Sequence, residues 1–148
     1  MKKSIILLAS LMSISFANAQ KLKSTDVPET VKASLQNKYP EAKELKWEKE
    51  NGNYEAAFKE GKTEYSLLID ASGNIIETEV DISFGELPAA AKDYISKNYP
   101  GQKIKETAKI IDAKGIVTYE AEVKGEDLIF DNTGKYLKKE TGSNNEHD

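Results

Sequence analysis

Hydrophobic residues recur along this chain with two different periods, and the same succession of periods occurs twice. Over residues 27–39 an apolar residue stands at every fourth position, which is typical of an amphipathic helix; these residues are Val27, Val31, Leu35 and Tyr39. Pro40 ends this helix, because the residue before a proline is disfavoured in helical conformation. The same stripe returns 60 residues later and predicts a second helix over 87–99, with the apolar residues Leu87, Ala91, Ile95 and Tyr99.

After each helix the period changes from about four to two, which predicts β-strands. In the first copy the alternating runs cover 45–47, 54–58, 65–69 and 76–82, and the turns between them contain Asn51-Gly52, Gly61-Lys62 and Asp70-Ala71-Ser72-Gly73. In the second copy the runs cover 104–110, 117–123, 128–130 and 136–137. Strands joined by such short turns are antiparallel neighbours. Each copy therefore predicts one helix followed by a four-stranded meander.

The predicted fold class is α+β, in two tandem repeats of about sixty residues. We assign 20–83 to the first repeat and 84–141 to the second. A narrow helical stripe must be buried against its own meander, so we expect both helices on one face of the sheet. The opposite face then stays open, as antiparallel sheets allow. Residues 142–148 carry no apolar side chain and are expected to form a disordered tail.

The first nineteen residues have the pattern of a secretory signal peptide. A basic start at Lys2-Lys3 precedes an apolar run over 5–16, and Ala17-Asn18-Ala19 is a small-x-small cleavage pattern. We expect cleavage between Ala19 and Gln20, and a periplasmic or secreted protein. The apolar run is shorter than the ~20 residues that span a bilayer, and no later run is longer, so stable membrane insertion is not expected.

Composition argues against reaction chemistry and against nucleic acid. Removing the two signal-peptide lysines from 21 leaves 19 cations against 25 acids, a net charge of −6, and the chain contains no arginine or cysteine. The single histidine, His147, falls in the predicted tail, so no imidazole is placed for catalysis. The acidic pairs Glu77/Glu79 and Glu120/Glu122 alternate on strands, as solvent-facing residues do. We predict a protein that is not an enzyme and needs no cofactor.

Two kinds of binding site remain as alternatives. A protein or peptide of the cell envelope could bind the open sheet face or a sheet edge, and the aromatic candidates for that contact are Trp47, Tyr65 and Tyr119. A lone tryptophan in a small domain is more often a core residue, so Trp47 has two interpretations.

The second alternative is a calcium- or small-ligand-responsive sensor. Its metal ligands would be Asp70, Asn74 and Asp131, in the two Asp-x-x-Gly turns. Those loops lack the Gly and Glu positions of an EF-hand, and hairpin geometry alone accounts for their composition. The sequence indicates no oligomeric state.

The repeated markers resemble those of a known family. Val27-Pro28 and Leu87-Pro88 open the helices, Tyr39-Pro40 and Tyr99-Pro100 close them, and Tyr-Glu-Ala recurs at 54–56 and 119–121. In this order the chain resembles the PepSY-like family, which is also described as β-lactamase-inhibitor-like, over residues 27–140. The resemblance implies an exported protein of tandem helix-plus-four-strand units without enzymatic activity. Its relatives are thought to bind proteins or peptides, sometimes as peptidase inhibitors, and some to respond to calcium. It assigns no functional residue in this chain.

Overall fold

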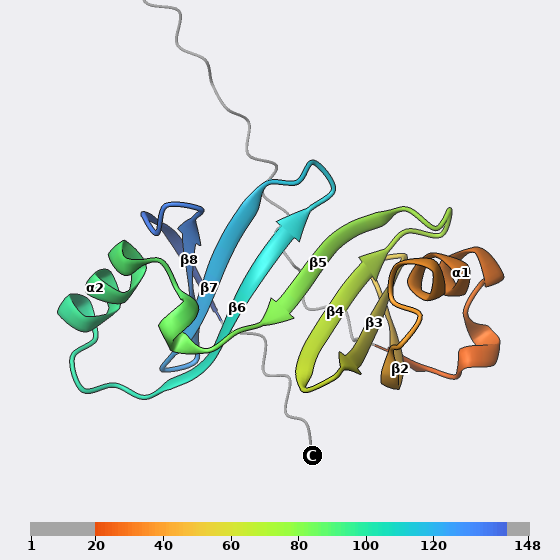
Figure 1. The fold of residues 1–148 in the computed structure, drawn as a ribbon, viewed down its shortest axis with the longest axis horizontal. Coiled ribbons are helices and arrows are strands. Elements are labelled where there is room, and N and C mark those ends of the chain that lie inside the picture. Colours follow the sequence, from red (N-terminus) through yellow and green to blue (C-terminus); the bar gives the residue numbers. More distant parts are fainter. Residues whose placement is uncertain (1–19, 142–148) are drawn as a thin grey trace, which may run out of the picture.

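The computed structural model describes residues 20–141 as two helices and one nine-stranded antiparallel sheet. The predicted signal peptide with Ala19 and the predicted tail lie outside the described residues. The strands are hydrogen-bonded in chain order, so the sheet is one continuous meander. Figure 1 shows α1 and α2 at opposite ends of this sheet, with β5 and β6 between them. The predicted α+β class is confirmed.

The elements follow the predicted order with one addition. The first part comprises β1 (Gln20–Leu22), the 3-10 turn η1 (Ser24–Asp26), α1 (Glu29–Lys38), β2 (Lys43–Glu50), β3 (Asn53–Glu60), β4 (Thr63–Ile69) and β5 (Ile75–Asp81). The second comprises η2 (Phe84–Glu86), α2 (Ala89–Asn98), β6 (Ile104–Asp112), β7 (Val117–Val123), β8 (Glu126–Asp131) and β9 (Tyr136–Thr141).

Strand β1 is the element that the hydrophobic pattern did not predict. Residues 20–22 are too few to show an alternation of apolar and polar positions. In the structure Leu22 lies opposite Trp47 of β2 and packs against the first core, which fixes this segment at the sheet edge. One apolar contact with a neighbouring strand is a tertiary effect that local periodicity does not report.

Each helix is bounded by the residues that the sequence singled out. Pro28 and Pro88 stand at the N-caps of α1 and α2, where a proline costs no helical hydrogen bond. Tyr39 and Tyr99 stand at the C-caps, and their backbone N–H groups donate to Leu35 and Ile95. The proline that follows each tyrosine then prevents another helical turn.

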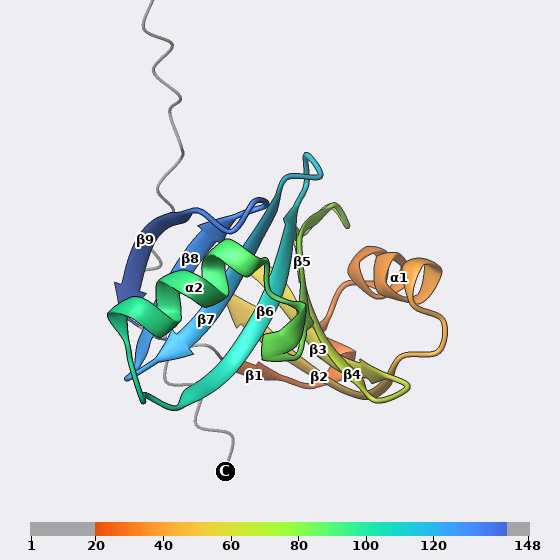
Figure 2. The same cartoon turned by 60° about the vertical axis from the view of Figure 1, so that its left-hand side comes forward.

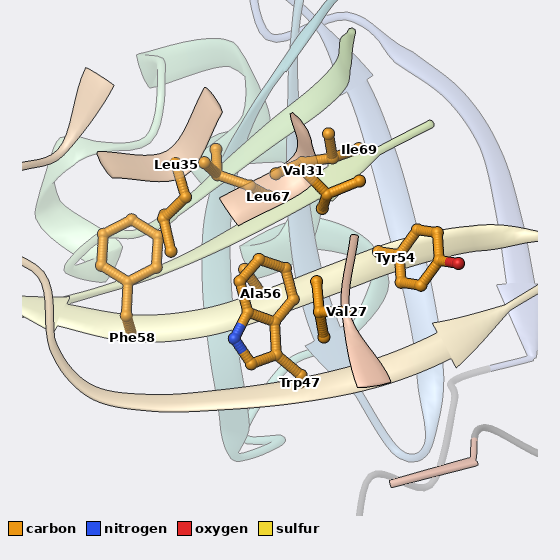
Figure 3. Packing of buried hydrophobic residues seen from close by; sticks show 9 residues of the cluster. All are labelled: Val27, Val31, Leu35, Trp47, Tyr54, Ala56, Phe58, Leu67 and Ile69. Atoms are coloured by element: carbon orange, nitrogen blue, oxygen red, sulfur yellow. The ribbon is translucent and has the colours of Figure 1, made fainter. Parts of the chain in front are cut away.

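Two separate hydrophobic cores form under the helices. In the first, Val31 and Leu35 of α1 point toward Leu67 and Ile69 of β4 and the strand β3 beneath them (Figure 3). In the second, Ala91 and Ile95 of α2 belong to one cluster with Ala121, Val123, Leu128 and Phe130. Figure 2 shows α2 lying across the strands of this second cluster.

Both helices lie on the same face of the sheet, as the strand register demonstrates. The cross-strand series Tyr65–Val80–Lys109–Tyr119–Phe130 runs from the first core to the second. Directly opposed residues share a face. Because Tyr65 packs on the first core and Phe130 belongs to the second, the helix-packed face is continuous along the sheet. We call it the covered face and the other the open face.

Candidate functional site

The open face carries the side chains that alternate with the core residues. One cross-strand series reads Ser66–Glu79–Ile110–Thr118, and the next reads Asp81–Ala108–Glu120–Ile129–Lys138. A third reads Glu106–Glu122–Asp127–Glu140. The centre of the open face, over β5–β8, therefore combines glutamates and aspartates with a few apolar residues.

Two of those apolar residues are buried although no helix covers them. Ala108 is 1% exposed and Ile129 is 8% exposed, and both stand outside the two core clusters. Two further apolar residues of this face are half-buried: Ile110 of β6, opposite Glu79, and Leu68 of β4, opposite Glu77. The open face thus has an apolar floor under a layer of carboxyl groups.

The carboxyl groups in this layer resist ionisation. Burial raises the pKa of Glu79 to about 7, reinforced by repulsion from Glu106 and Glu77. Burial raises the pKa of Glu120 to about 8, with added repulsion from Glu79 and Asp127. Desolvation disfavours the charged form, and nearby like charges act in the same direction. The two glutamates hold protons at a pH where an ordinary glutamate holds none.

The surrounding acids are shifted in the same direction. Burial is the first cause that raises the pKa of Glu77, Glu106 and Asp81, and carboxylate neighbours are the second. Cations stand at the margin: the Lys105 ammonium lies 3.3 Å from Glu122, and Lys138 pairs with Glu140 on β9. Within residues 20–141 no lysine forms an ion pair with Glu79 or Glu120.

The aromatic residues that we proposed for partner binding lie on the covered face. Trp47 is 3% exposed in the first core, next to Val27 and Ala56 (Figure 3), so the core interpretation of this residue applies. Tyr65 is half-buried and stacks on Phe58 with ring centroids 5.4 Å apart. Tyr119 is half-buried against the second core. Their alternation with charged residues located the inner face correctly but could not show that a helix covers it.

Trp47 has one unusual feature at the sheet edge. Its buried Nε1–H has no hydrogen-bond partner. A hollow of about 530 Å³ beside it is lined by Lys21 and Leu22 of β1, by Ser24, and by residues 45–48 of β2. The hollow lies where the pairing of β1 with β2 ends, at Leu22 and Trp47, and Leu45 in its lining is 40% exposed.

The residues proposed for calcium lie at separate hairpin ends. Asp70 Oδ1 accepts the backbone N–H groups of Ser72 and Asn74 at 2.9 Å each, and Oδ2 accepts Asn74 Nδ2. Asp131 caps the β8–β9 turn in a similar way: its Oδ1 accepts the Thr133 hydroxyl at 2.6 Å and the backbone N–H groups of Thr133 and Lys135. These bonds lower the pKa of both aspartates. Between residues 20 and 141 no three His, Cys, Asp or Glu residues are grouped to hold a metal ion.

A third hairpin, between β6 and β7, uses the same turn through Asp112, which sequence reasoning had not grouped with the others. The larger omission was Glu79 and Glu120. Alternation placed them on the outward side of their strands, as the register shows, and from that we expected ordinary solvated acids. They are flanked by residues of other strands, Ile110 beside Glu79 and Ala108 and Ile129 beside Glu120, and a pattern within one strand does not contain these neighbours.

Comparison with known proteins gives a consistent result at the level of family and fold. The family model described as "Putative beta-lactamase-inhibitor-like, PepSY-like" matches residues 14–77 and again 76–138. No curated protein matches the chain. None of the helices within the described residues is long and apolar enough to cross a membrane.

Solved structures share the fold at low sequence identity. A DUF2874 family protein of Bacteroides uniformis has a TM-score of 0.70 at 20% identity, covering 76% of this chain and 88% of its own. A "putative periplasmic" protein of Bacteroides eggerthii has a TM-score of 0.74 at 16% identity, with 80% and 93% covered. A BLIP-like protein of Bacteroides fragilis has a TM-score of 0.65 at 22% identity, with 82% and 92% covered.

These likenesses extend over both halves of the chain, which agrees with the duplicated pattern of helix and strands in the sequence. The chain therefore belongs to the PepSY-like, β-lactamase-inhibitor-like family.

Proposed function

We propose that this protein is an exported, non-enzymatic binding module whose two tandem helix-plus-four-strand units present the open face to a protein or peptide. The observation that carries the proposal is the combination on that face of a buried apolar floor, at Ala108 and Ile129, with desolvated carboxyl groups at Glu79 and Glu120. Desolvated polar groups beside apolar surface are unfavourable in the free protein, and a partner that supplies matching groups relieves that cost.

The proposal needs neither a reactive group nor a cofactor. It supposes a flat contact across several strands, where the central strands β5 and β6 join the two repeats. A standard protein–protein contact covers about 800 Å² on each partner. An uncovered sheet of nine strands, each about 4.8 Å from the next, is wide enough for such a contact.

Export is supported by the signal-peptide pattern of residues 1–19 and by the similar structure from Bacteroides eggerthii, which is described as periplasmic. The proposed compartment is the periplasm or the exterior. Its test is mass spectrometry of the N-terminus of protein recovered from the periplasmic fraction. A terminus at Gln20 is expected; a full-length chain retained in the cytoplasm would contradict export.

Site-specific photo-crosslinking tests the binding surface. A photoreactive residue replaces Ile110, which is half-buried at the centre of the open face, and in a matched protein it replaces Ser96, which is exposed on α2. Both are illuminated in an envelope extract with increasing amounts of unlabelled wild-type protein as competitor. We expect a discrete adduct at position 110 that the competitor suppresses, and none at position 96. Equal or non-competed adducts at both positions would overturn the proposal.

A further inference from the structure

We propose that the segment which docks on the open face is cationic and extended, with lysine or arginine side chains reaching Glu79 and Glu120 across β5–β7. This inference rests on the proposed function and names the chemistry of the partner. Three features of the open face lead to it: its uncompensated acids, its apolar floor, and the spacing of its strands.

The charge on the centre of the open face has one sign. The groups that act on Glu79 are the carboxylates Glu55, Glu77, Glu106 and Asp127, and those that act on Glu120 are Glu79, Glu106, Asp127 and Glu140. Asp81, Asp112 and Glu122 stand on the same strands β5–β7. The lysines beside the centre of this face, Lys105 and Lys138, are engaged with Glu122 and Glu140. A cation between Glu79 and Glu120 is thus the charge that this surface lacks.

The apolar floor selects for a cation on a long aliphatic stem. Ala108 lies directly opposite both Asp81 and Glu120, and Ile129 lies opposite Glu120 on the next strand. Lysine and arginine bury their methylene stems along apolar surface while the charged head reaches a polar group. A hydrated metal ion would satisfy the carboxylates but would make no apolar contact with Ile110, which is half-buried directly opposite Glu79, so the structure favours a side chain over a free ion.

The strand spacing matches a short extended segment. Glu79 and Glu120 stand two strands apart and two residues apart in register, so their backbones are separated by about 12 Å. Alternate residues of an extended chain project to the same side about 7 Å apart, and two flexible side chains close the difference. Two cations at alternate positions in one partner segment can therefore engage both glutamates.

Docking of such a segment would displace protons. In the free protein the raised pKa of each glutamate keeps the carboxyl partly protonated near neutral pH. An approaching cation favours the ionised form, so the pKa falls and the proton is released to buffer. Binding should then be coupled to proton release near pH 7.5, and uncoupled near pH 9.5, where both groups are already ionised.

Calorimetry on the full mature chain tests the inference. The probe is a nine-residue peptide with lysine and valine in alternation, and the comparison peptide carries glutamate in place of lysine. Titrations at about 150 mM salt, in two buffers of different ionisation enthalpy, count the protons released. We expect the lysine peptide alone to bind, with release of roughly one proton at pH 7.5 and none at pH 9.5.

Two double variants with the same change of charge locate the effect. Glu79→Gln with Glu120→Gln should weaken peptide binding at least tenfold and abolish proton release. Glu41→Gln with Asp93→Asn neutralises two exposed acids away from the open face and should change affinity less than twofold. Equal losses in both pairs, binding of the glutamate peptide, or absence of proton release would overturn the inference.

A separate titration with calcium chloride and no peptide distinguishes a free cation. Calcium that releases the same protons and competes with the lysine peptide would also overturn the inference, because the face would then be a cation site. The photo-crosslinking experiment separates this inference from the proposed function. A competed adduct at position 110 with a partner segment that lacks cations would support the proposed function and contradict only this inference.

Discussion

The two faces of the same sheet show how differently one strand can be used. On the covered face, Leu67 and Phe130 are fully buried in cores closed by helices. On the open face, one residue along from each, Leu68 and Ile129 are held among carboxyl groups with no helix above them. The covered face is closed by the helices of the same chain, and among the described residues the Trp47 Nε1–H is its buried side-chain group without a hydrogen-bond partner, whereas the open face retains desolvated acids. The difference indicates that the covered face maintains the fold and that the open face is available for binding.

The largest expected effect comes from neighbouring leucines on β4. Leu67→Ala removes a residue that is 0% exposed in the first core and should lower the free energy of unfolding by about 3 kcal/mol, through lost transfer energy and a cavity. Leu68→Ala, on the open face, should cost about 1 kcal/mol because that side chain is only half-buried. Urea unfolding measures both.

The leucine pair also tests the assignment of faces. If Leu68→Ala lowers the free energy of unfolding as much as Leu67→Ala, the open face is itself a structural core. The assignment of folding to one face and binding to the other would then be wrong. A small loss for Leu68→Ala, combined with weakened partner crosslinking at position 110, would extend the comparison to function.

A second prediction concerns how closely the covered face is packed at a turn. Gly134 has φ +87°, and a Cβ there would lie 2.7 Å from Pro88 Cβ and 2.8 Å from the Ala91 backbone N of α2. Gly125 has φ +75°, but an added Cβ would meet nothing within 4 Å. Both changes to alanine strain the backbone by about 1 kcal/mol. Only Gly134→Ala also displaces a helix.

We therefore expect Gly134→Ala to destabilise the protein by about 2–3 kcal/mol and Gly125→Ala by about 1 kcal/mol, measured as midpoints of thermal unfolding. The two glycines differ in surroundings far more than in backbone conformation, so the difference isolates the contact between the β8–β9 turn and α2. Equal losses would mean that the helix shifts freely and that the covered face is not closely packed there.

Much of this architecture follows from local signals in the sequence. The helix stripes, the Tyr-Pro stops and the Asp-x-x-Gly turns each act within a few residues, and the helices and turns formed where those signals stand. Strand β1 and the raised pKa of Glu79 did not follow from local signals, since both depend on residues distant in the chain. Leu22 pairs with Trp47 on the neighbouring strand, and Glu106 repels the Glu79 carboxylate.

The candidate site was accordingly harder to predict than the fold. Aromatic residues are frequent in binding sites, so Trp47, Tyr65 and Tyr119 were reasonable candidates, yet they mark the face that the helices occupy. Alternation assigns a residue to one of two faces. It does not state which face a helix covers in three dimensions, nor how far a charged neighbour on the next strand excludes water.

The third prediction is a dependence of stability on pH that arises from the open face alone. In the unfolded chain Glu79 and Glu120 have ordinary glutamate pKa values, near 4.5, whereas in the folded chain they are raised to about 7 and about 8. Between these values the folded state binds more protons than the unfolded state. The free energy of unfolding must therefore fall as pH rises through this window.

We expect a loss of about 1–2 kcal/mol between pH 5.5 and pH 8.5, less than two independent shifts would give, because part of the raised pKa of Glu120 comes from the charge of Glu79. The aspartates with lowered pKa, Asp70 and Asp131, act only at more acidic pH and leave this window unaffected. Urea unfolding at both pH values, on wild type and on the Glu79→Gln/Glu120→Gln variant, measures the slope. The variant should flatten it, while Glu41→Gln should not. A wild-type protein equally stable at both pH values would show that the open-face acids are well solvated. The two faces would then differ only in that helices cover one of them.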